Sequence, residues 1–499
     1  MTFFAAFPAR IKMFIAKRGF AKLTDAAKAA QSVARPREPI GRQVVHGDQS
    51  RDVRVTRLPN DLTVISEDSN IPVTRVVVAV KAGARHEPPE VPGLSHALRN
   101  AAPLGTRECS AFGLSRNMEQ LGASLSATTT RDHIIYTMNV HRNHLPETIK
   151  FLGYVVAKQE FKRWEVKDAA ARLDLDLDIY EHRPDIQLME HLHAAAYRDG
   201  LANSLFAPRW AAHHYDAKML REYVQSAFKP SRMAIAVYGA RHEDILNYAA
   251  DNFKIDYGYM KKPMTEFEEC APEMHTLQQL PKEHGTNAQH RDIPAKYGGG
   301  QCFHQTLDHL AYAAVAVEGA GINNPKEALA LSLLQQFLGS EPSVKWSNGQ
   351  KVSPLAKAAA GATREEYAIT GLNICHSDSG LFGFTAVAHG KDIAKVVQAG
   401  LHVLREGKGV DLQRLQEAKN KLVAKLLMHH ESRCEQFHDM AIQALSTGNI
   451  MSVNDAVAIV DQIRPDDLAK YAQSLVQKGT FSMAAVGNLS HLPRLDEFV

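Results

Sequence analysis

The sequence contains an internal duplication, and this feature restricts the possible folds more than any other. Residues 79–84 and 316–321 begin alike and end in small residues, and nearby positions match at the same spacing. At this spacing, Pro88 matches Pro325, and Leu94-Ser95 matches Leu331-Ser332. At a second constant spacing, four further residues match: Tyr223, Gln225, Ser226 and Gly239 correspond to Tyr471, Gln473, Ser474 and Gly487. Ordered matches of this kind indicate two copies of one structural unit.

Each copy is predicted to mix strands and helices. In the first copy, the predicted strands are 53–66 (a pair around Pro59-Asn60-Asp61), 73–81, 124–129, 133–140 and 233–238, and the predicted helices are 93–102, 145–156, 164–182, 185–198 and 217–227. The second copy repeats this order and ends in a strand at 481–486. Because strands and helices do not strictly alternate, the pattern favours the α+β class.

Proline and glycine mark the boundary between the copies. Residues 257–300 carry four prolines and end in Gly298-Gly299-Gly300, with few apolar residues, which is typical of a linker. We therefore expect an N-terminal region at 1–50, a first domain at 51–256, the linker at 257–300 and a second domain at 301–499.

Composition excludes several classes of protein. A formal net charge of +3 over 499 residues gives no surface-wide basic field, which argues against nucleic acid as a partner. The sequence has no apolar run near the roughly 18 residues that a membrane span needs. The five cysteines (Cys109, Cys270, Cys302, Cys375 and Cys434) are scattered, which favours reduced thiols in a non-secretory compartment.

The first 24 residues resemble a mitochondrial transit peptide. They contain five basic residues and no acidic one, and phenylalanine and isoleucine residues recur at helical spacing. The sequence Arg18-Gly19-Phe20-Ala21 predicts cleavage after Phe20. The alternative is a surface helix or a basic tail, and residues 25–50 are expected to be an extension without strong periodicity.

The octet at 93–100 contains an altered metal-binding motif. In the zinc-peptidase pattern H-x-x-E-H, both histidines bind zinc and the glutamate activates a water molecule. Here His96 is present, but Arg99 and Asn100 occupy the other two positions. A guanidinium cannot act as a general base. At about 4 Å and an effective dielectric constant of about 20, it would also repel a divalent ion by about 8 kcal/mol.

This octet and the duplicated α+β plan resemble the pitrilysin-like (M16) metallopeptidase family. Within that family, the chain is most similar to the non-catalytic core proteins of ubiquinol–cytochrome c reductase (respiratory complex III). The segments that carry this similarity are 161–166, 192–198, 201–203, 377–383, 418–422 and 482–489. The resemblance implies two duplicated domains, each a mostly antiparallel sheet packed with helices.

The resemblance also implies a function. The chain would be a structural and assembly subunit on the matrix side of the mitochondrial inner membrane, peripheral to it. It would pair with the other core protein and contact the cytochrome b, cytochrome c1 and iron–sulfur protein modules. We expect no catalytic, cofactor-binding or metal-binding residues and no cofactor, and the sequence has no C-x-x-C-H haem motif.

Proteins of this family have two other functions that this chain could share. The first is the regulatory subunit of a mitochondrial processing peptidase, which carries a glycine-rich loop, whereas residues 338–349 here hold only scattered glycines. The second is an active peptidase, against which Arg99 argues.

The resemblance identifies Asp176 as the position of the third zinc ligand, a glutamate in active members. His96 and Asp176 are too few for a stable zinc site. We therefore hypothesise an ion pair between Arg99 and Asp176. The alternative is that Asp174, Asp176 and Asp178 follow a solvated helix face.

Other clusters receive structural interpretations. His430, Cys434 and His438, with Glu431 and Glu435 adjacent, are spaced to share one helical face and could hold a metal, but we favour a polar or interface-facing face. Glu190-His191-Leu192-His193 is interpreted as structural. Gly298-Gly299-Gly300 is interpreted as linker flexibility. Residues 377–384 are a candidate contact strand for which core packing is preferred.

Overall fold

The computed structural model describes residues 53–69, 71–254, 294–339, 353–406, 412–477 and 480–498. The predicted targeting segment, the extension at 25–50, residues 257–293 of the predicted linker and most of the 338–349 loop lie outside these residues. We call 53–254 the N-terminal half and 294–498 the C-terminal half.

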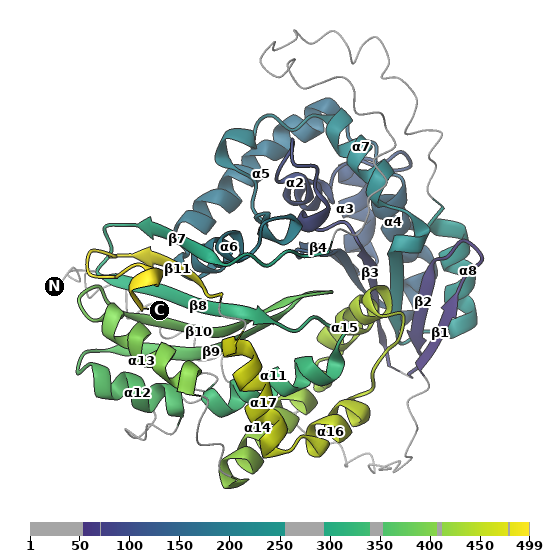
Figure 1. Ribbon diagram of the computed structural model, residues 1–499. Coiled ribbons are helices and arrows are strands. Elements are labelled where there is room, and N and C mark those ends of the chain that lie inside the picture. Colours follow the sequence, from purple (N-terminus) through teal and green to yellow (C-terminus); the bar gives the residue numbers. More distant parts are fainter. Residues whose placement is uncertain are drawn as a thin grey trace, which may run out of the picture. The chain divides into compact units, whose positions relative to one another are not determined.

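The N-terminal half contains a six-stranded sheet in the order β1-β2-β6-β3-β5-β4 (Figure 1). The strands are β1 Val53–Arg57, β2 Thr63–Glu67, β3 Val73–Val80, β4 Ser124–Thr129, β5 Ile134–His141 and β6 Met233–Tyr238. Only β2 and β6 run parallel; the other neighbours are antiparallel. The central strand β3 is rich in valine, whose branched side chains suit a buried pleated surface.

The C-terminal half contains a five-stranded sheet in the order β7-β11-β8-β10-β9. The strands are β7 Gly300–Gln305, β8 Leu310–Gly319, β9 Tyr367–Cys375, β10 Gly380–His389 and β11 Ser482–Gly487. The one parallel pair is β7 with β11, which corresponds to the parallel pair β2 with β6 of the N-terminal sheet. The order matches β2-β6-β3-β5-β4 strand for strand, so the predicted duplication and the α+β class are confirmed.

Equivalent residues make equivalent contacts in the two halves. In helix α7, Ser226 donates to the carbonyl of Tyr223 at 2.9 Å, and in α17 Ser474 donates to the carbonyl of Tyr471 at 2.8 Å. Just after β6, Gly239 has a φ of 87°, and at the end of β11 Gly487 has a φ of 118°. Both glycines therefore adopt conformations that other residues rarely reach.

Helices cover both sheets. In the N-terminal half they are α2 Leu94–Ala101, α3 Ala111–Gln120, α4 Leu145–Ala157, α5 Arg163–Glu181, α6 Pro184–Ala196, α7 Ala217–Ala227 and α8 His242–Asn252. In the C-terminal half they are α11 Pro325–Leu338, α12 Pro354–Ala362, α13 Ile393–Glu406, α14 Leu412–Glu431, α15 Arg433–Ser446, α16 Val453–Gln462, α17 Pro465–Gln477 and α18 Leu495–Phe498. Helices α3 and α8 were not predicted from the sequence.

The two halves exchange one helix each (Figure 1). Helix α6 of the N-terminal half packs on β7, β8 and β11, where Leu192 and Ala196 lie among Ala314 and Leu381. Helix α15 of the C-terminal half packs on β2, β3 and β6 through Phe437 and other buried residues. Each sheet therefore buries one of its faces under a helix from the other half.

The glycine run at 298–300 is ordered, so its interpretation as linker flexibility is wrong. The amides of Gly298 and Gly299 both donate to the carbonyl of Ala196, and Gly300 begins β7. A Cβ atom at Gly298 would lie 2.4 Å from Nε of Arg198. That side chain could move aside, so the need for glycine is clearer at Gly299 and Gly300, whose φ angles of 65° and 147° are rarely adopted by other residues.

Candidate functional site

Helix α2 carries the three residues of the altered motif. Its N-cap, Gly93, has no side chain to satisfy the free amides at the start of the helix. Glu87 takes this role: its carboxylate accepts from the amide of Gly93 at 2.6 Å and from the amide of Ser95 at 2.7 Å. Glu87 is buried, and burial raises its pKa to about 7. The hydrogen bonds from Ser95 and Gly93 act in the opposite direction and lower the pKa, but burial has the larger effect. This role of Glu87 was not predicted from the sequence, because the capping residue lies outside the helix.

Helix α5 carries Asp176 and packs against α2. His96, Arg99 and Asn100 follow the i, i+3, i+4 spacing, so α2 presents all three on the face toward Asp176. Asp176 accepts a hydrogen bond from Asn100 Nδ2 at 3.0 Å and is paired with Arg99 Nη2. The hypothesised ion pair between Arg99 and Asp176 is therefore confirmed.

The hydrogen bonds of His96 define its tautomer. The side chain is fully buried, and its Nδ1 accepts from the backbone amide of Ala207 at 3.1 Å. A ring nitrogen that accepts carries no proton, so in the neutral ring the proton is on Nε2. That nitrogen lies 3.1 Å from Asp176 Oδ2 and donates to it. One carboxylate oxygen thus receives three donors, from His96, Arg99 and Asn100.

Burial and the charge of Arg99 keep His96 neutral, and the surrounding donors keep Asp176 ionised. Burial, and then the charge of Arg99, lower the pKa of His96 to about 4. Burial alone would raise the pKa of Asp176, but hydrogen bonds from Asn100 and His96 and the charge of Arg99 together lower it. The cluster is therefore a neutral imidazole and an ion pair around pH 7.

This donor set does not fit a zinc ion. Zinc sites use three or four unprotonated nitrogen, sulfur or oxygen ligands. Here the Nδ1 of His96 already accepts from a backbone amide, its Nε2 carries a proton, and a guanidinium bonds the one carboxylate. No group of three or more histidine, cysteine, aspartate or glutamate side chains placed to hold a metal ion occurs in the described ranges.

The neighbouring carboxylates on α5 are also paired. Asp174 lies 2.9 Å from Nε2 of His213, and Asp178 pairs with Arg209. The side chains of Asp174 and Asp178 are 37% and 57% exposed, so the alternative of a solvated helix face holds for these two. Asp176, at 29% exposed, belongs to the cluster with α2.

The prediction that His430, Cys434 and His438 share one helix face is wrong. Helix α14 ends at Glu431 and α15 begins at Arg433, so the three residues lie on two helices. His438 lies instead against the other half, with its Nε2 at 2.7 Å from Oγ1 of Thr137 on β5.

Glu190 and His193 form part of a buried polar junction between the halves, which agrees with their structural interpretation. Glu190 pairs with Arg131 at 2.8 Å, and Nε2 of His193 lies 3.1 Å from Nε2 of His376. Nearby, Arg85 pairs with Asp378 at 2.6 Å. The roles of Arg85, Arg131 and His376 were not predicted from the sequence, because their contacts join residues far apart in the chain.

The candidate contact strand at 377–384 is mainly core. Leu381, Phe382 and Phe384 on β10 are fully buried. The residues before the strand, Ser377 and Asp378, contact Asp132 and Arg85 of the N-terminal half.

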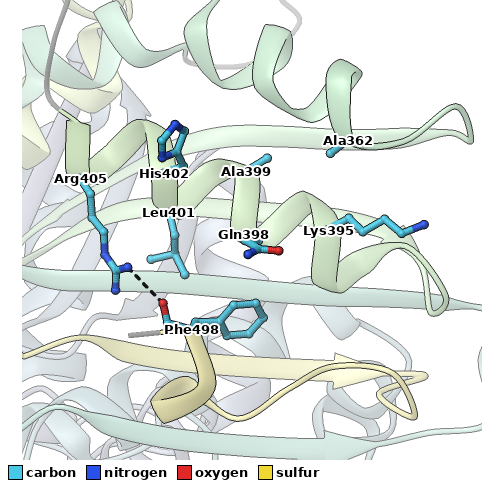
Figure 2. A pocket seen from close by; sticks show the side chains of 8 residues that line it. All are labelled: Ala362, Lys395, Gln398, Ala399, Leu401, His402, Arg405 and Phe498. Atoms are coloured by element: carbon cyan, nitrogen blue, oxygen red, sulfur yellow. Dashed lines mark hydrogen bonds between the residues drawn. The ribbon is translucent and has the colours of Figure 1, made fainter.

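A separate pocket of about 470 Å³ lies in the C-terminal half, along α13 (Figure 2). Its lining residues are Ala362, Lys395, Gln398, Ala399, Leu401, His402, Arg405 and Phe498. Arg405 donates to the carbonyl of Phe498 at 3.1 Å, and Lys395 donates to Asp392 at 2.7 Å. The pocket shares no residue with the His96 cluster, and its two fixed cations already bond to the chain.

None of the helices in the described ranges has both the length and the apolar composition to cross a bilayer.

Comparisons with known proteins give consistent matches. The family model "Insulinase (Peptidase family M16)" matches residues 63–209, and the model "Peptidase M16 inactive domain" matches residues 214–422. The mitochondrial cytochrome b-c1 complex subunit 2 of Mus musculus is 32% identical over 451 residues, which cover 90% of this chain and 92% of that protein. The human subunit 2 matches equally, at 32% identity over the same shares of both chains.

A processing-peptidase subunit also matches, at lower identity. The probable mitochondrial-processing peptidase subunit alpha-1 of Arabidopsis thaliana is 26% identical over 480 residues, which cover 95% of this chain and 89% of that protein. The family models, the near full-length similarity and the duplicated sheets agree with one another. This chain therefore belongs to the M16 peptidase family.

Proposed function

We propose that this chain is a non-catalytic structural and assembly subunit of mitochondrial complex III. It pairs there with the other core protein and contacts the cytochrome b, cytochrome c1 and iron–sulfur protein modules. It is peripheral to the inner membrane, on the matrix side, and residues 1–24 direct its import. One observation carries the proposal: the chain is 32% identical to cytochrome b-c1 complex subunit 2 over 90% of its length.

The chemistry of the altered motif supports a non-catalytic role. Peptide hydrolysis in this family needs a water molecule activated by zinc and a glutamate. Arg99 occupies the position of that glutamate and pairs with Asp176, which occupies the position of a ligand. A degenerate zinc-peptidase site is therefore the interpretation that this geometry favours.

The alternative is a regulatory subunit of a processing peptidase. The lower identity to that group, 26%, makes it the weaker candidate.

Co-migration tests the proposal. Mitochondria with an epitope-tagged chain are solubilised in mild detergent, and native gels are probed for the tag, cytochrome b and the catalytic subunit of the processing peptidase. We expect the tag to run with cytochrome b. Co-migration with the processing peptidase instead would support the alternative and exclude the proposal.

A restored-motif variant tests the absence of catalysis. Purified wild-type chain is expected to lack stoichiometric zinc and to leave a presequence peptide intact. The triple variant R99E/N100H/D176E restores the ligand types and is expected to bind zinc. Cleavage by the wild-type chain that a chelator abolishes would contradict the proposal.

A further inference from the structure

Two buried histidines from different halves face each other at the polar junction. His193 lies on α6, and His376 lies in the turn between β9 and β10; their exposed fractions are 4% and 9%. Their Nε2 atoms are 3.1 Å apart, and the two rings meet edge to face. Such a contact is a hydrogen bond only if one nitrogen carries a proton and the other does not. The protonation of both rings therefore decides whether this contact holds.

The outer nitrogen of His193 determines which ring donates. Its Nδ1 lies 2.7 Å from the carbonyl oxygen of Met189, and a carbonyl oxygen only accepts, so this nitrogen carries a proton. In the neutral ring, Nε2 of His193 is then an acceptor. Nε2 of His376 must donate to it, which leaves Nδ1 of the neutral His376 ring without a proton. The contact thus consists of two neutral rings with one N–H between them.

His193 has no favourable position for a further proton. That proton would go on Nε2, where two N–H groups would then face each other across 3.1 Å and the hydrogen bond would be lost. Burial lowers the pKa of His193 well below its ordinary value, and the charge of Arg131 lowers it further. Protonation of His193 and the contact with His376 therefore exclude each other.

His376 has one free nitrogen, but burial opposes its protonation. Its Nδ1 lies 3.9 Å from Oδ2 of Asp132, beyond hydrogen-bond distance. Asp132 is already paired with Arg85 at 3.2 Å and accepts from the amide of Ser377 at 3.1 Å. Burial lowers the pKa of His376 to about 4, although the charge of Asp132 acts in the opposite direction. Both rings therefore stay neutral in the intact contact until the pH approaches about 4.

The charged groups around the two rings are already paired with one another. The ionisable groups that face the rings from the packed elements are Glu190 and Tyr197 on α6, Arg131 and Asp132 before β5, Arg85, and Asp378 beside His376. Arg131 pairs with Glu190, and Arg85 pairs with both aspartates. His133, next to Asp132, acts on that carboxylate when it is charged.

The two aspartates of this junction stay ionised when the pH falls below neutral. Burial raises their pKa values, but neighbouring cations and hydrogen bonds hold the pKa values of Asp132 and Asp378 below the ordinary value of aspartate. Moderate acid therefore acts on the contact between His193 and His376 and leaves the ion pairs of these aspartates intact.

We infer that the contact between His193 and His376 is an acid-sensitive latch, which holds α6 of the N-terminal half against the β9–β10 turn of the C-terminal half. The latch is closed while both rings are neutral. When α6 and the turn separate, each ring meets water and regains its ordinary pKa of 6.5, so acid favours the open form. The latch is a property of this chain alone and does not depend on the proposed function.

The pH range of opening follows from the lowered pKa values. A group whose pKa is lower in the closed form than in the open form stabilises the closed form fully above the higher value. The stability of the latch is therefore complete above about pH 6.5 and decreases as the pH falls toward about 4, the value of His376. In that range, each histidine raises the opening constant by about tenfold per pH unit.

Hydrogen exchange of the full chain at pH 7, 6 and 5 tests the latch. The reporter is the amide of Ser377, which donates to Asp132 of the other half and is released when the turn leaves α6. After correction for the intrinsic pH dependence of exchange, we expect its protection to fall at least tenfold between pH 6 and pH 5, while the amides of β3 keep theirs. Unchanged protection at Ser377, or an equal loss in β3, would overturn the inference.

A pair of glutamines replaces the histidines without titrating. In H193Q/H376Q, one side-chain oxygen can accept where His193 accepts, and one side-chain N–H can donate where His376 donates. We expect the protection of Ser377 in this variant to change less than twofold between pH 6 and pH 5. H144Q, at a histidine whose side chain is 48% exposed, is the control and should keep the wild-type response. A double variant that keeps the wild-type response would show that another group causes it.

A single variant decides the test if the double variant misfolds. H376Q keeps the N–H that faces His193 and removes one of the two titrating rings. We expect its response between pH 6 and pH 5 to be at least threefold smaller than that of the wild type, because only His193 still gains a proton on opening. A response equal to that of the wild type would exclude the latch, whatever complex the chain belongs to.

Discussion

At the scale of single residues, Asp176 shows how an ion pair can occupy a former ligand position. Its Oδ2 receives hydrogen bonds from the buried imidazole and Asn100 and pairs with Arg99. Only the ion pair was anticipated from the sequence. The amide of Ala207, which sets the tautomer of His96, belongs to a loop that is distant in sequence, so the residues around His96 do not predict this contact.

A double-mutant cycle on Arg99 and Asp176 measures their coupling. R99M keeps the apolar stem, and D176N keeps the shape of the side chain. Because both groups are partly exposed, we expect a coupling of about 1 kcal/mol in the free energy of unfolding by urea at pH 7. The pKa of Asp176 is lowered in the fold, so this coupling is present above the ordinary pKa of aspartate and is lost as the pH falls through the lowered value. If the effects of R99M and D176N on the unfolding free energy are additive at pH 7, the two side chains do not stabilise each other.

Glu87 gives stability a pH dependence of the opposite sign. Its pKa is about 7 in the fold and about 4.5 in the unfolded chain, so the folded state keeps its proton to higher pH. Stability from this group is therefore greatest below about 4.5, decreases as the pH rises toward 7, and changes little above that; the difference is at most about 3 kcal/mol.

The variant E87Q isolates that dependence, because glutamine does not titrate. We expect the difference in unfolding free energy between wild type and E87Q to change between pH 5 and pH 7.5, with the wild type losing stability relative to the variant. A difference that stays constant across this interval would show that Glu87 has no raised pKa.

At the scale of elements, alternation and helical periodicity predicted most strands and helices of the N-terminal half, but not where each helix packs. Helices α6 and α15 carry apolar faces that periodicity detects, yet the sheet that buries each face belongs to the other half. The sequence alone cannot distinguish these arrangements, because an apolar face has the same pattern whichever sheet covers it. Gly298 was misinterpreted for a related reason: its close neighbour, Arg198, is distant in sequence.

The helix exchange predicts that a mutation in one half destabilises the other. Phe437 on α15 is fully buried, and its ring centroid lies 5.2 Å from that of Tyr238 on β6. F437A should reduce the free energy of unfolding by about 3–5 kcal/mol and should accelerate amide exchange in β3 and β6 more than in β8 and β10. W210A, at a side chain that is 64% exposed, is the control and should change stability little. If amide exchange became faster only in the C-terminal sheet, the conclusion that α15 supports the N-terminal sheet would be contradicted.

At the scale of the whole described molecule, the exchanged helices and the polar junction predict that the two halves unfold together. The side chain of Arg85 is only 7% exposed and bonds Asp378, Asp132 and Ser377, while Arg131 pairs with Glu190 within the same junction. Removing one member of a buried ion pair leaves its partner uncompensated, which costs about 3–5 kcal/mol. Because each half also lends a helix to the other sheet, neither half can lose its packing without exposing the apolar face of its neighbour.

We therefore expect one calorimetric transition for the wild-type chain, and R85M should lower its midpoint without splitting it. The exposed pair of Arg183 and Asp185 supplies the control, since R183M should leave the midpoint within about one degree of the wild type. Two resolved transitions in the wild-type chain, each assigned to one half by hydrogen exchange, would show that the halves are independent domains. A single transition that R85M lowers, together with exchange that rises in both sheets at once, would instead establish that the junction and the exchanged helices make the halves one cooperative unit.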